Sequence, residues 1–136
     1  MKELKTFADE SSMDDVQAFV EEELSLLGCD PVFMNEISLV VEEVYINIIH
    51  YAYEDKGGDA VVRLDSDMSS KTLTLSFTDK GPEFNPLLRE EPDIDEPADT
   101  RPIGGLGIFL VRKIMDECAY ERKDGCNVLT IKKAWK

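Results

Sequence analysis

The segment from Val32 to about Tyr53 constrains the fold of this chain more than any other. Its apolar residues form a stripe with the i, i+3, i+4, i+7 spacing of a helix, and more apolar residues lie on the opposite side. The stripe consists of Ile37, Val40, Val41, Val44, Ile48 and Tyr51, and the opposite side carries Ile46, Ile49 and Tyr53. Because water-facing helices have only one apolar side, we expect other elements to bury this helix on more than one face.

A narrow polar stripe, Glu36, Glu43, Asn47 and His50, runs between the two apolar sides. At about 100° per residue, its last three members fall within about 60° of one another. Polar groups on a largely buried helix are costly without partners, so the stripe is either a solvated edge or part of a site. Glu43 and Asn47 lie one turn apart, where a carboxylate could act as general base and an amide oxygen could bind Mg²⁺. His50 is the only histidine, and we expect it to be structural.

The remaining periodicity predicts strands and helices around that segment. Strands are expected at 2–8, 60–65, 71–78, 119–123 and 127–134, and helices at about 11–27 and 108–116. In the last strand Val128, Leu129 and Ile131 are expected to supply core. Helices on one face of a mainly antiparallel sheet make an α+β two-layer sandwich, and the length fits a single domain over residues 1–136.

A long loop is predicted between the strand that ends near residue 78 and the next helix. Five of the six prolines lie from Pro82 to Pro102, and acidic residues are frequent in 90–99. Loops longer than about 12–15 residues inside compact domains are usually lids, binding loops or disordered segments. We interpret residues of about 85–105 as a lid.

The formal net charge of −14, from 29 acidic and 15 basic residues, limits the partners of the protein. A strongly negative surface disfavours nucleic acid and anionic membranes, whereas a basic protein partner or plain solubility is compatible with it. The three cysteines include no CxxC pair, so neither a disulfide framework nor a zinc site is predicted. A reducing cytoplasm is the simplest compartment for such cysteines, and no apolar run approaches the ~18 residues of a membrane span.

Two glycine-containing motifs follow. Asp79-x-Gly81 ends a predicted strand, where an Asp could accept a hydrogen bond from a base amino group; an ordinary strand-ending turn is the alternative. Gly104-Gly105-Leu106-Gly107 opens a predicted helix. Glycines allow the backbone to approach an anion, and a helix N-terminus presents unpaired N–H groups, so phosphate binding is one interpretation of this motif.

The order and spacing of these motifs resemble the Bergerat-type, histidine-kinase-like ATP-binding domain of the GHKL superfamily. Within it, the chain is most similar to the small anti-sigma factor serine kinases of bacteria. The stretches EISLVVEEVYINIIHYAY, LSFTDKGPEFNP and RPIGGLGIFLVRKIMDE carry the resemblance. One departure is Glu83, which stands where the superfamily often has a second glycine after D-x-G.

The resemblance implies a role for each motif residue. Asn47 would bind the Mg²⁺ that bridges the ATP phosphates, and Glu43 would be the general base toward a serine hydroxyl. Asp79 would accept from the adenine amino group, and Gly81 would leave room for the ring. The hinge and phosphate-facing turn of the lid would be formed by Gly104, Gly105 and Gly107. Arg101, also in the lid, would place a cation against the terminal phosphate.

The function implied by this resemblance is that of an anti-sigma-factor-type serine kinase using ATP and Mg²⁺. Its substrate would be a serine of an STAS-type anti-anti-sigma protein, and it could also sequester a sigma factor; homodimer formation stays open. One alternative is a regulatory module of the same fold that binds nucleotide or partner without transferring phosphate. Another is a detached histidine-kinase catalytic domain, which would need a partner that carries the phosphoacceptor histidine.

Overall fold

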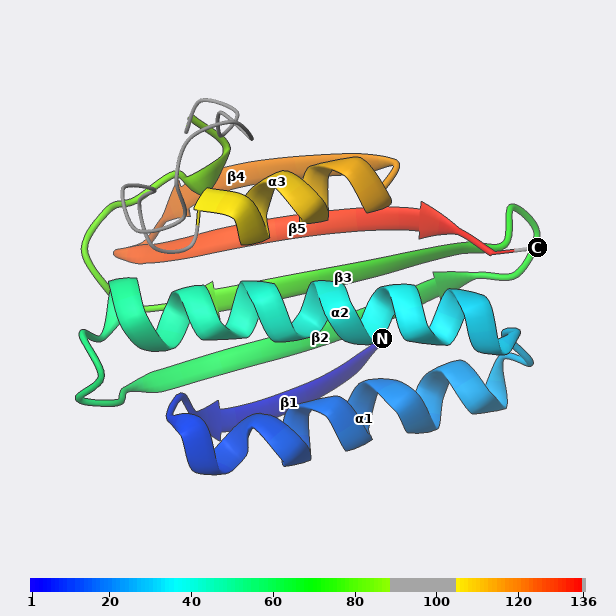
Figure 1. Ribbon diagram of the computed structural model, residues 1–136, viewed down its shortest axis with the longest axis horizontal. Coiled ribbons are helices and arrows are strands. Elements are labelled where there is room, and N and C mark those ends of the chain that lie inside the picture. Colours follow the sequence, from blue (N-terminus) through cyan, green and yellow to red (C-terminus); the bar gives the residue numbers. More distant parts are fainter. Residues whose placement is uncertain (89–104, 136) are drawn as a thin grey trace.

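The computed structural model describes residues 1–88 and 105–135 and contains the predicted elements in the predicted order (Figure 1). The strands are β1 (Lys2–Phe7), β2 (Asp59–Asp67), β3 (Thr72–Asp79), β4 (Glu117–Lys123) and β5 (Cys126–Ala134). The helices are α1 (Met13–Leu26), α2 (Pro31–Asn47) and α3 (Gly105–Ile114), with short helical turns η1 (Glu10–Ser12), η2 (Ile48–Ala52) and η3 (Pro86–Leu88). In the described residues, no helix combines the length and apolarity needed to cross a membrane.

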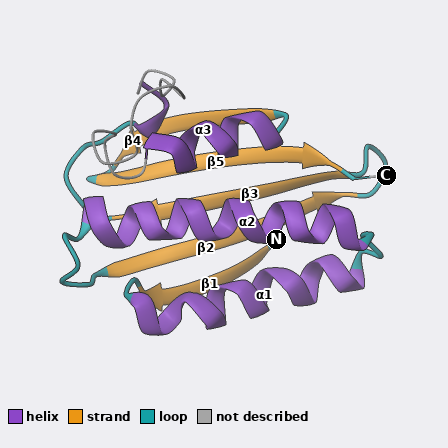
Figure 2. Cartoon of the chain, in the orientation of Figure 1, coloured by secondary structure: helices purple, strands orange, loops and turns teal. Residues whose placement is uncertain are grey.

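The five strands form one antiparallel sheet in the order β1-β2-β3-β5-β4. Helices α1, α2 and α3 all lie on the same face of that sheet (Figures 1 and 2). The α+β two-layer sandwich expected from the sequence is therefore confirmed. In this register Asp79, the last residue of central β3, pairs with Asn127 of β5, which brings two distant segments together.

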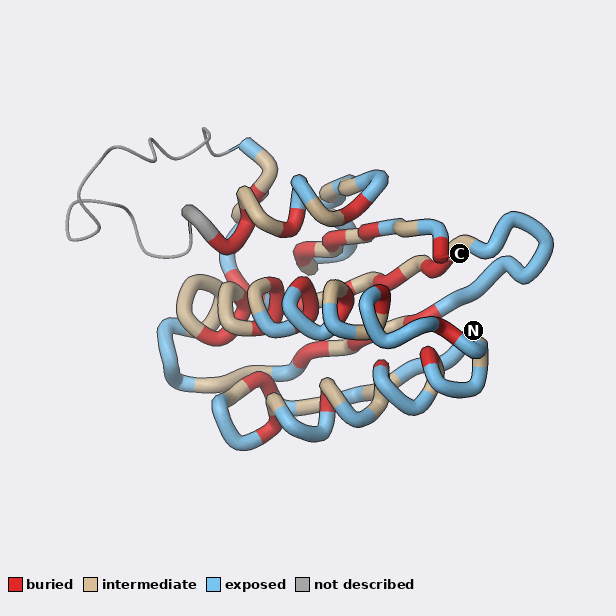
Figure 3. Tube along the Cα trace, turned by 45° about the vertical axis from the view of Figure 1, so that its right-hand side comes forward, coloured by how far each residue is buried: buried red, intermediate tan, exposed pale blue. Residues whose placement is uncertain are grey.

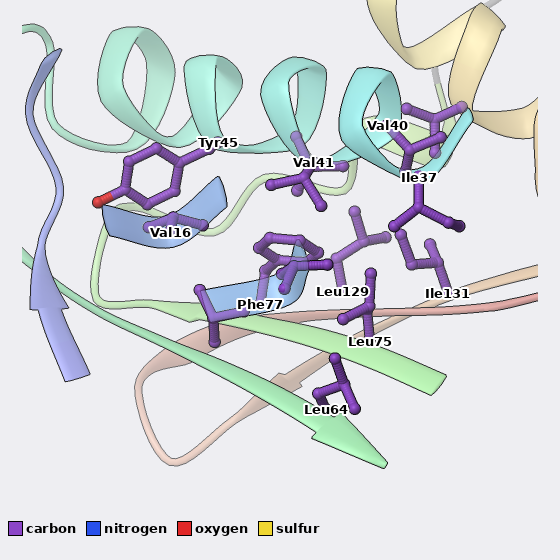
Figure 4. Packing of buried hydrophobic residues seen from close by; sticks show 14 of the residues in the cluster. Val16, Ile37, Val40, Val41, Tyr45, Leu64, Leu75, Phe77, Leu129 and Ile131 are labelled. Carbon is purple, nitrogen blue, oxygen red and sulfur yellow. The ribbon is translucent and has the colours of Figure 1, made fainter. Parts of the chain in front are cut away.

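Helix α2 lies between α1 and α3 over the middle of the sheet, and it is buried on more than one face as predicted (Figure 1). Its inward residues pack on the sheet core, and Figure 4 shows this packing with the ring of Tyr45 at one end. Tyr45 is fully buried, and its hydroxyl shares a 2.5 Å hydrogen bond with Ser12 Oγ. Since Ser12 Oγ also donates to the carbonyl of Phe7, this contact joins α2 to the end of β1 and the start of α1.

The α-helical form of this segment ends earlier than predicted. Residues Ile48–Ala52 form a π-helical turn, in which the amide of Tyr53 donates to the carbonyl of Ile48 over 3.2 Å. Such turns are rare and frequently occur at functional sites. A π-helical turn contains more residues than an α-helical turn, so the rotation per residue is smaller and the polar stripe does not continue to His50. The imidazole of His50 instead lies 2.5 Å from the carboxylate of Asp55.

The alternation of buried and less buried residues identifies the two faces of β5. Figure 3 shows how buried positions are interspersed with less buried ones along the chain. Asn127, Leu129 and Ile131 are buried under the helices, while Val128 is half-buried on the opposite face. The prediction that Val128 supplies core was therefore wrong. Hydrophobicity suggested it, but successive strand residues point to opposite faces, and Leu129 and Ile131 fix which face is inside.

The net charge is concentrated in the helical layer. Residues 6–55, which include α1 and α2, contain 13 of the 29 acidic residues and no lysine or arginine. The rest of the chain is almost balanced, with 16 acidic and 15 basic residues. Among the described residues, one acidic residue of this layer forms a salt bridge with a lysine: Glu23 lies 3.2 Å from the Nζ of Lys2. The acidity is thus a property of one side of the molecule.

We expect Leu75→Ala to lower the free energy of unfolding by roughly 2–5 kcal/mol, because the substitution opens a cavity in the sheet core. Leu75 is fully buried at the centre of β3. The adjacent Thr74 faces the other side of the sheet, so Thr74→Ala is a matched control with an expected loss of about 1 kcal/mol or less. Urea titrations of both variants measure the difference; equal losses would contradict the assigned faces.

Candidate functional site

A pocket opens where the C-terminal end of α2 meets the end of β3 and the start of β5. It has about 460 Å³ of empty space including its mouth. Most of the lining is apolar, with side chains such as Val44, Ile48, Phe77, Ile108 and Leu129. Its polar lining residues are Asn47, Asp79, Tyr120 and Asn127. An apolar pocket with a few converging polar groups is typical of a small-molecule site, and two of those groups were predicted from the sequence.

Asp79 lies at the inner wall of this pocket and is only 7% exposed. The carboxylate is held by two hydrogen bonds to Oδ1, one of 2.9 Å from the amide N–H of Gly81 and one of 2.9 Å from Nδ2 of Asn127. Burial raises the pKa of the Asp79 carboxyl above its ordinary value. The two hydrogen bonds and the charge of Arg122 lower it, but burial is the larger effect. The other oxygen, Oδ2, takes part in neither bond and can accept from a ligand donor.

Asn127 is the polar residue of the site that sequence reasoning missed. It is 6% exposed, and its side chain links the base of the pocket to the turn that follows β3. Nδ2 donates to Asp79 and, over 2.9 Å, to the carbonyl of Pro82; Oδ1 accepts from the amide of Phe84 over 3.1 Å. One signal was present in the sequence: an amide stands at a position of β5 that alternation assigns to the core.

Gly81 is required by a close approach of two backbones. An added Cβ would lie 2.6 Å from Cβ and 2.7 Å from the carbonyl oxygen of Ala52 in the π-helical turn. Because these atoms belong to backbone or to a rigid side chain, there is no room for a larger residue without moving the turn. Gly81 thus brings the end of β3 directly against the segment that follows Asn47.

Asn47 ends α2 at the pocket wall, and its Nδ2 is buried without a hydrogen-bond partner in the described part of the chain. A buried amide group without a partner costs free energy unless a ligand satisfies the side chain. Nδ2 can only donate, so the ligand group that satisfies it is an acceptor such as a phosphate oxygen; Mg²⁺, which prefers oxygen ligands, would take Oδ1 of the same amide. The residue therefore meets the chemical requirement of a metal ligand at this wall.

Glu43 lies one turn before Asn47 and against the first turn of α3. Its carboxylate contacts Gly107, where an added Cβ would collide with Oε2. Burial raises the pKa of the Glu43 carboxyl, and the neighbouring charge of Glu42 raises it further. Glu43 is not among the residues that line the pocket, but a partly buried carboxylate with a raised pKa, one turn from Asn47, is suited to accept a proton.

Two aromatic residues missed by sequence reasoning also line the pocket. The rings of Tyr51 and Phe84 stack with centroids 5.8 Å apart and an interplanar angle of 14°. They come from the π-helical turn and from the segment after Pro82. The turn from α- to π-helix could not be read from the sequence, so Tyr51 could not be assigned to this wall. Phe84 was missed because its segment is held there by a long-range contact, the hydrogen bond from its amide to Asn127 Oδ1.

The described residues include only part of the predicted lid. Gly105 begins α3, and Gly107 lies in its first turn against Glu43. Residues Pro86–Leu88 form η3, and Pro86 lines the pocket. Arg101, Gly104 and the rest of the predicted lid through residue 104 lie outside the described residues.

The fold is that of a histidine-kinase-like ATPase domain. Comparison with known families matches residues 7–133 to the histidine kinase-like ATPase domain, and the chain belongs to that family. This confirms the resemblance to the GHKL superfamily. The catalytic domain of histidine kinase ThkA, solved in a nucleotide-free form, covers 99% of this chain and 97% of its own with a TM-score of 0.53. At 17% identity this likeness concerns the fold alone.

The curated relatives are bacterial protein kinases. Serine/threonine-protein kinase BtrW of Bordetella bronchiseptica is 28% identical over 95 residues, which cover 70% of this chain and 66% of that protein. Serine-protein kinase RsbW of Staphylococcus aureus (strain MRSA252) is 24% identical over 99 residues, which cover 70% of this chain and 62% of that protein. The chain thus spans less than two thirds of the length of these relatives.

The raised pKa of Asp79 predicts a pH dependence of stability. Between the ordinary carboxyl pKa of about 3.9 and the higher pKa in the folded state, the folded chain binds more protons, so the free energy of unfolding falls as pH rises through this window. Asp79→Asn removes the ionisation but keeps an oxygen for Gly81 and Asn127. We expect the stability of the variant relative to wild type to increase from about pH 4 to about pH 7 in urea titrations.

Asp59→Asn, which removes an exposed carboxylate at the start of β2, controls for the loss of one negative charge. The pH dependence of its relative stability should be clearly smaller. If Asp79→Asn and Asp59→Asn gave the same profile, burial of Asp79 would not be the cause.

Proposed function

We propose that this chain is an ATP-binding serine protein kinase of the anti-sigma type. The observation that carries the proposal is the pairing, in one pocket, of the buried Asp79 carboxylate with the Asn47 amide whose Nδ2 lacks a partner. The first suits the amino group of a base. The second could bind Mg²⁺ through Oδ1, while its unpartnered Nδ2 would donate to an acceptor such as a phosphate oxygen. Membership of an ATPase family and kinase relatives support the same interpretation.

The base would occupy the apolar part of the pocket. Asp79 Oδ2 would accept from the amino group of adenine. Gly81 does not line the pocket, and it would act by letting the turn after β3 pack against Ala52, which does. Apolar side chains and the stacked rings of Tyr51 and Phe84 would exclude water from the base. Exclusion of water strengthens a hydrogen bond to a charged acceptor.

The phosphates would extend toward the end of the pocket where α2 and α3 meet. Asn47 would hold Mg²⁺, which when bound neutralises phosphate charge. Glu43 would take the proton of the attacking serine hydroxyl, in keeping with its raised pKa. The first turn of α3, with Gly105 and Gly107, would offer backbone N–H groups to phosphate.

Gly104 and Arg101 keep the roles that the family resemblance implies. Gly104 would belong to the hinge of the lid over about residues 85–105, and Arg101 would place a cation against the terminal phosphate. Phosphoryl transfer depends mainly on positioning and on charge neutralisation, and such a cation contributes to the second.

The proposed phosphoacceptor is a serine of an STAS-type anti-anti-sigma protein, and a sigma factor is the second proposed partner. The acidic helical layer of residues 6–55 supports protein over nucleic-acid partners, because phosphate backbones are repelled by it. Within the same proposal the chain acts in the cytoplasm as one domain, with homodimer formation to be measured.

Two other functions remain to be separated from this one by experiment. A regulatory module would bind Mg-ATP without phosphorylating a partner. A histidine-kinase catalytic domain would transfer phosphate to a partner's histidine, giving acid-labile instead of acid-stable label. Calorimetric titration with ATP, with and without Mg²⁺, comes first, since absence of binding at millimolar nucleotide would refute the kinase proposal.

We expect Glu43→Gln to reduce phosphorylation of an STAS-type partner by about 100-fold or more while ATP binding is kept, because the amide cannot accept the serine proton. Asn47→Ala should abolish the dependence of ATP affinity on Mg²⁺. Both are measured with purified proteins and radiolabelled ATP, together with calorimetry.

Glu36→Gln is the matched control, since Glu36 carries the same carboxylate two turns before Glu43 on the same helix. Its phosphorylation rate should equal that of wild type. If Glu43→Gln and Asn47→Ala also kept the wild-type rate, the assigned residues would have no part in the reaction.

A further inference from the structure

We infer that Tyr120 and Arg122 of β4, acting through the amide of Asn127, set the selectivity of the pocket for adenine over guanine. This inference rests on the proposed function, because it concerns the base of the nucleotide that the pocket binds. Tyr120 OH lies 2.5 Å and Arg122 Nη1 lies 3.2 Å from Oδ1 of Asn127. Arg122 is not among the residues that line the pocket, so it would act as a positioning residue.

The orientation of the Asn127 amide is fixed by groups whose chemistry is unambiguous. Oδ1 faces the amide N–H of Phe84 and the guanidinium of Arg122, which can only donate. Nδ2 faces the carbonyl oxygens of Pro82 at 2.9 Å and Gly81 at 3.5 Å, which can only accept. A flipped amide would set like partners against each other on both sides.

This orientation determines what Asp79 offers to a ligand. Because Nδ2 donates toward Asp79 Oδ1, that oxygen is an acceptor, and this hydrogen bond favours the ionised form of the carboxylate. Arg122 helps in a second way, since its positive charge favours the ionised carboxylate. Arg122 Nη1 also donates to the carbonyl of Gly81 over 2.8 Å and thereby holds the turn after β3.

An ionised Asp79 discriminates between the two purines. Adenine carries an exocyclic amino group, which donates to a carboxylate, at the ring position where guanine carries a carbonyl oxygen, which would be repelled. If the Asn127 amide flipped, its oxygen would face Asp79 Oδ1, and protonation of Asp79 would relieve the repulsion. A protonated Asp79 can donate to the guanine carbonyl, so selectivity would fall.

The experiment is a calorimetric titration of Mg-ATP and Mg-GTP over a range of pH. The variants are Tyr120→Phe, which deletes the hydroxyl that donates to Oδ1, and Arg122→Met, which deletes the guanidinium. The matched control is Lys123→Met, since Lys123 is exposed, adjacent and on the other face of β4. We expect the ratio of ATP to GTP affinity to fall roughly tenfold in the two variants and to stay unchanged in the control.

The pH profile separates positioning of Asp79 from a general loosening of the pocket. ATP affinity should be lost as pH falls through the pKa of Asp79, and the midpoint of that loss should move to higher pH in Tyr120→Phe and Arg122→Met. A pocket that is merely loosened loses affinity for both nucleotides without a shift of midpoint. If Arg122→Met fails to fold by circular dichroism, Tyr120→Phe alone decides.

The outcomes separate this inference from the function on which it rests. Wild-type protein that binds neither nucleotide would refute the proposed function itself. Wild-type protein that selects ATP, together with Tyr120→Phe and Arg122→Met that keep both the affinity ratio and the pH midpoint, would overturn the inference and leave the proposed function intact.

Discussion

The two-sided burial of helix α2 is the constraint on which the rest of the structure depends. Its apolar stripe packs on the middle of the sheet, while α1 and α3 cover its flanks. A sheet of five strands is wide enough to seat three helices side by side, with α2 over the centre. Polar residues on such a helix can stand only at its exposed edge or its end, so Asn47 reaches the pocket where α2 gives way to the π-helical turn, with Glu43 one turn before it.

The sheet contributes the opposite wall of the pocket through register and strand ends. Antiparallel pairing of β3 with β5 brings Asp79 level with Asn127, although 48 positions separate them in the chain. Both lie on the helix-facing side of the sheet, where the same two strands otherwise carry the buried apolar residues Phe77, Leu129 and Ile131. A carboxylate on that face is tolerable because Asn127 and the amide of Gly81 satisfy one of its oxygens. The interior of the sandwich thus becomes polar only at one end.

The sequence was sufficient for the order of elements, for the two layers, and for placing Glu43 and Asn47 one helical turn apart and Asp79 at the end of a strand. These depend on local periodicity and on turn chemistry, which neighbouring residues determine. It was not sufficient for Asn127, whose partners are set by strand register, or for the π-helical turn, which packs Ala52 against Gly81. Val128 was assigned to the core because of its hydrophobicity, yet alternation along β5 decides the face.

The distribution of charge gives the proposed site an electrostatic problem of its own. Thirteen acidic residues without a lysine or arginine occupy residues 6–55, and Glu43 stands inside that region beside the space proposed for phosphate. At physiological ionic strength charges are screened over about 8 Å, so acids on the outer surface of α1 affect the pocket weakly while Glu43 affects it strongly. A polyanion would therefore need compensation that is local: the N-terminus of α3, a divalent cation and an arginine. Local compensation of this kind allows an acidic protein to bind nucleotide while its acidic helical surface attracts a basic protein partner.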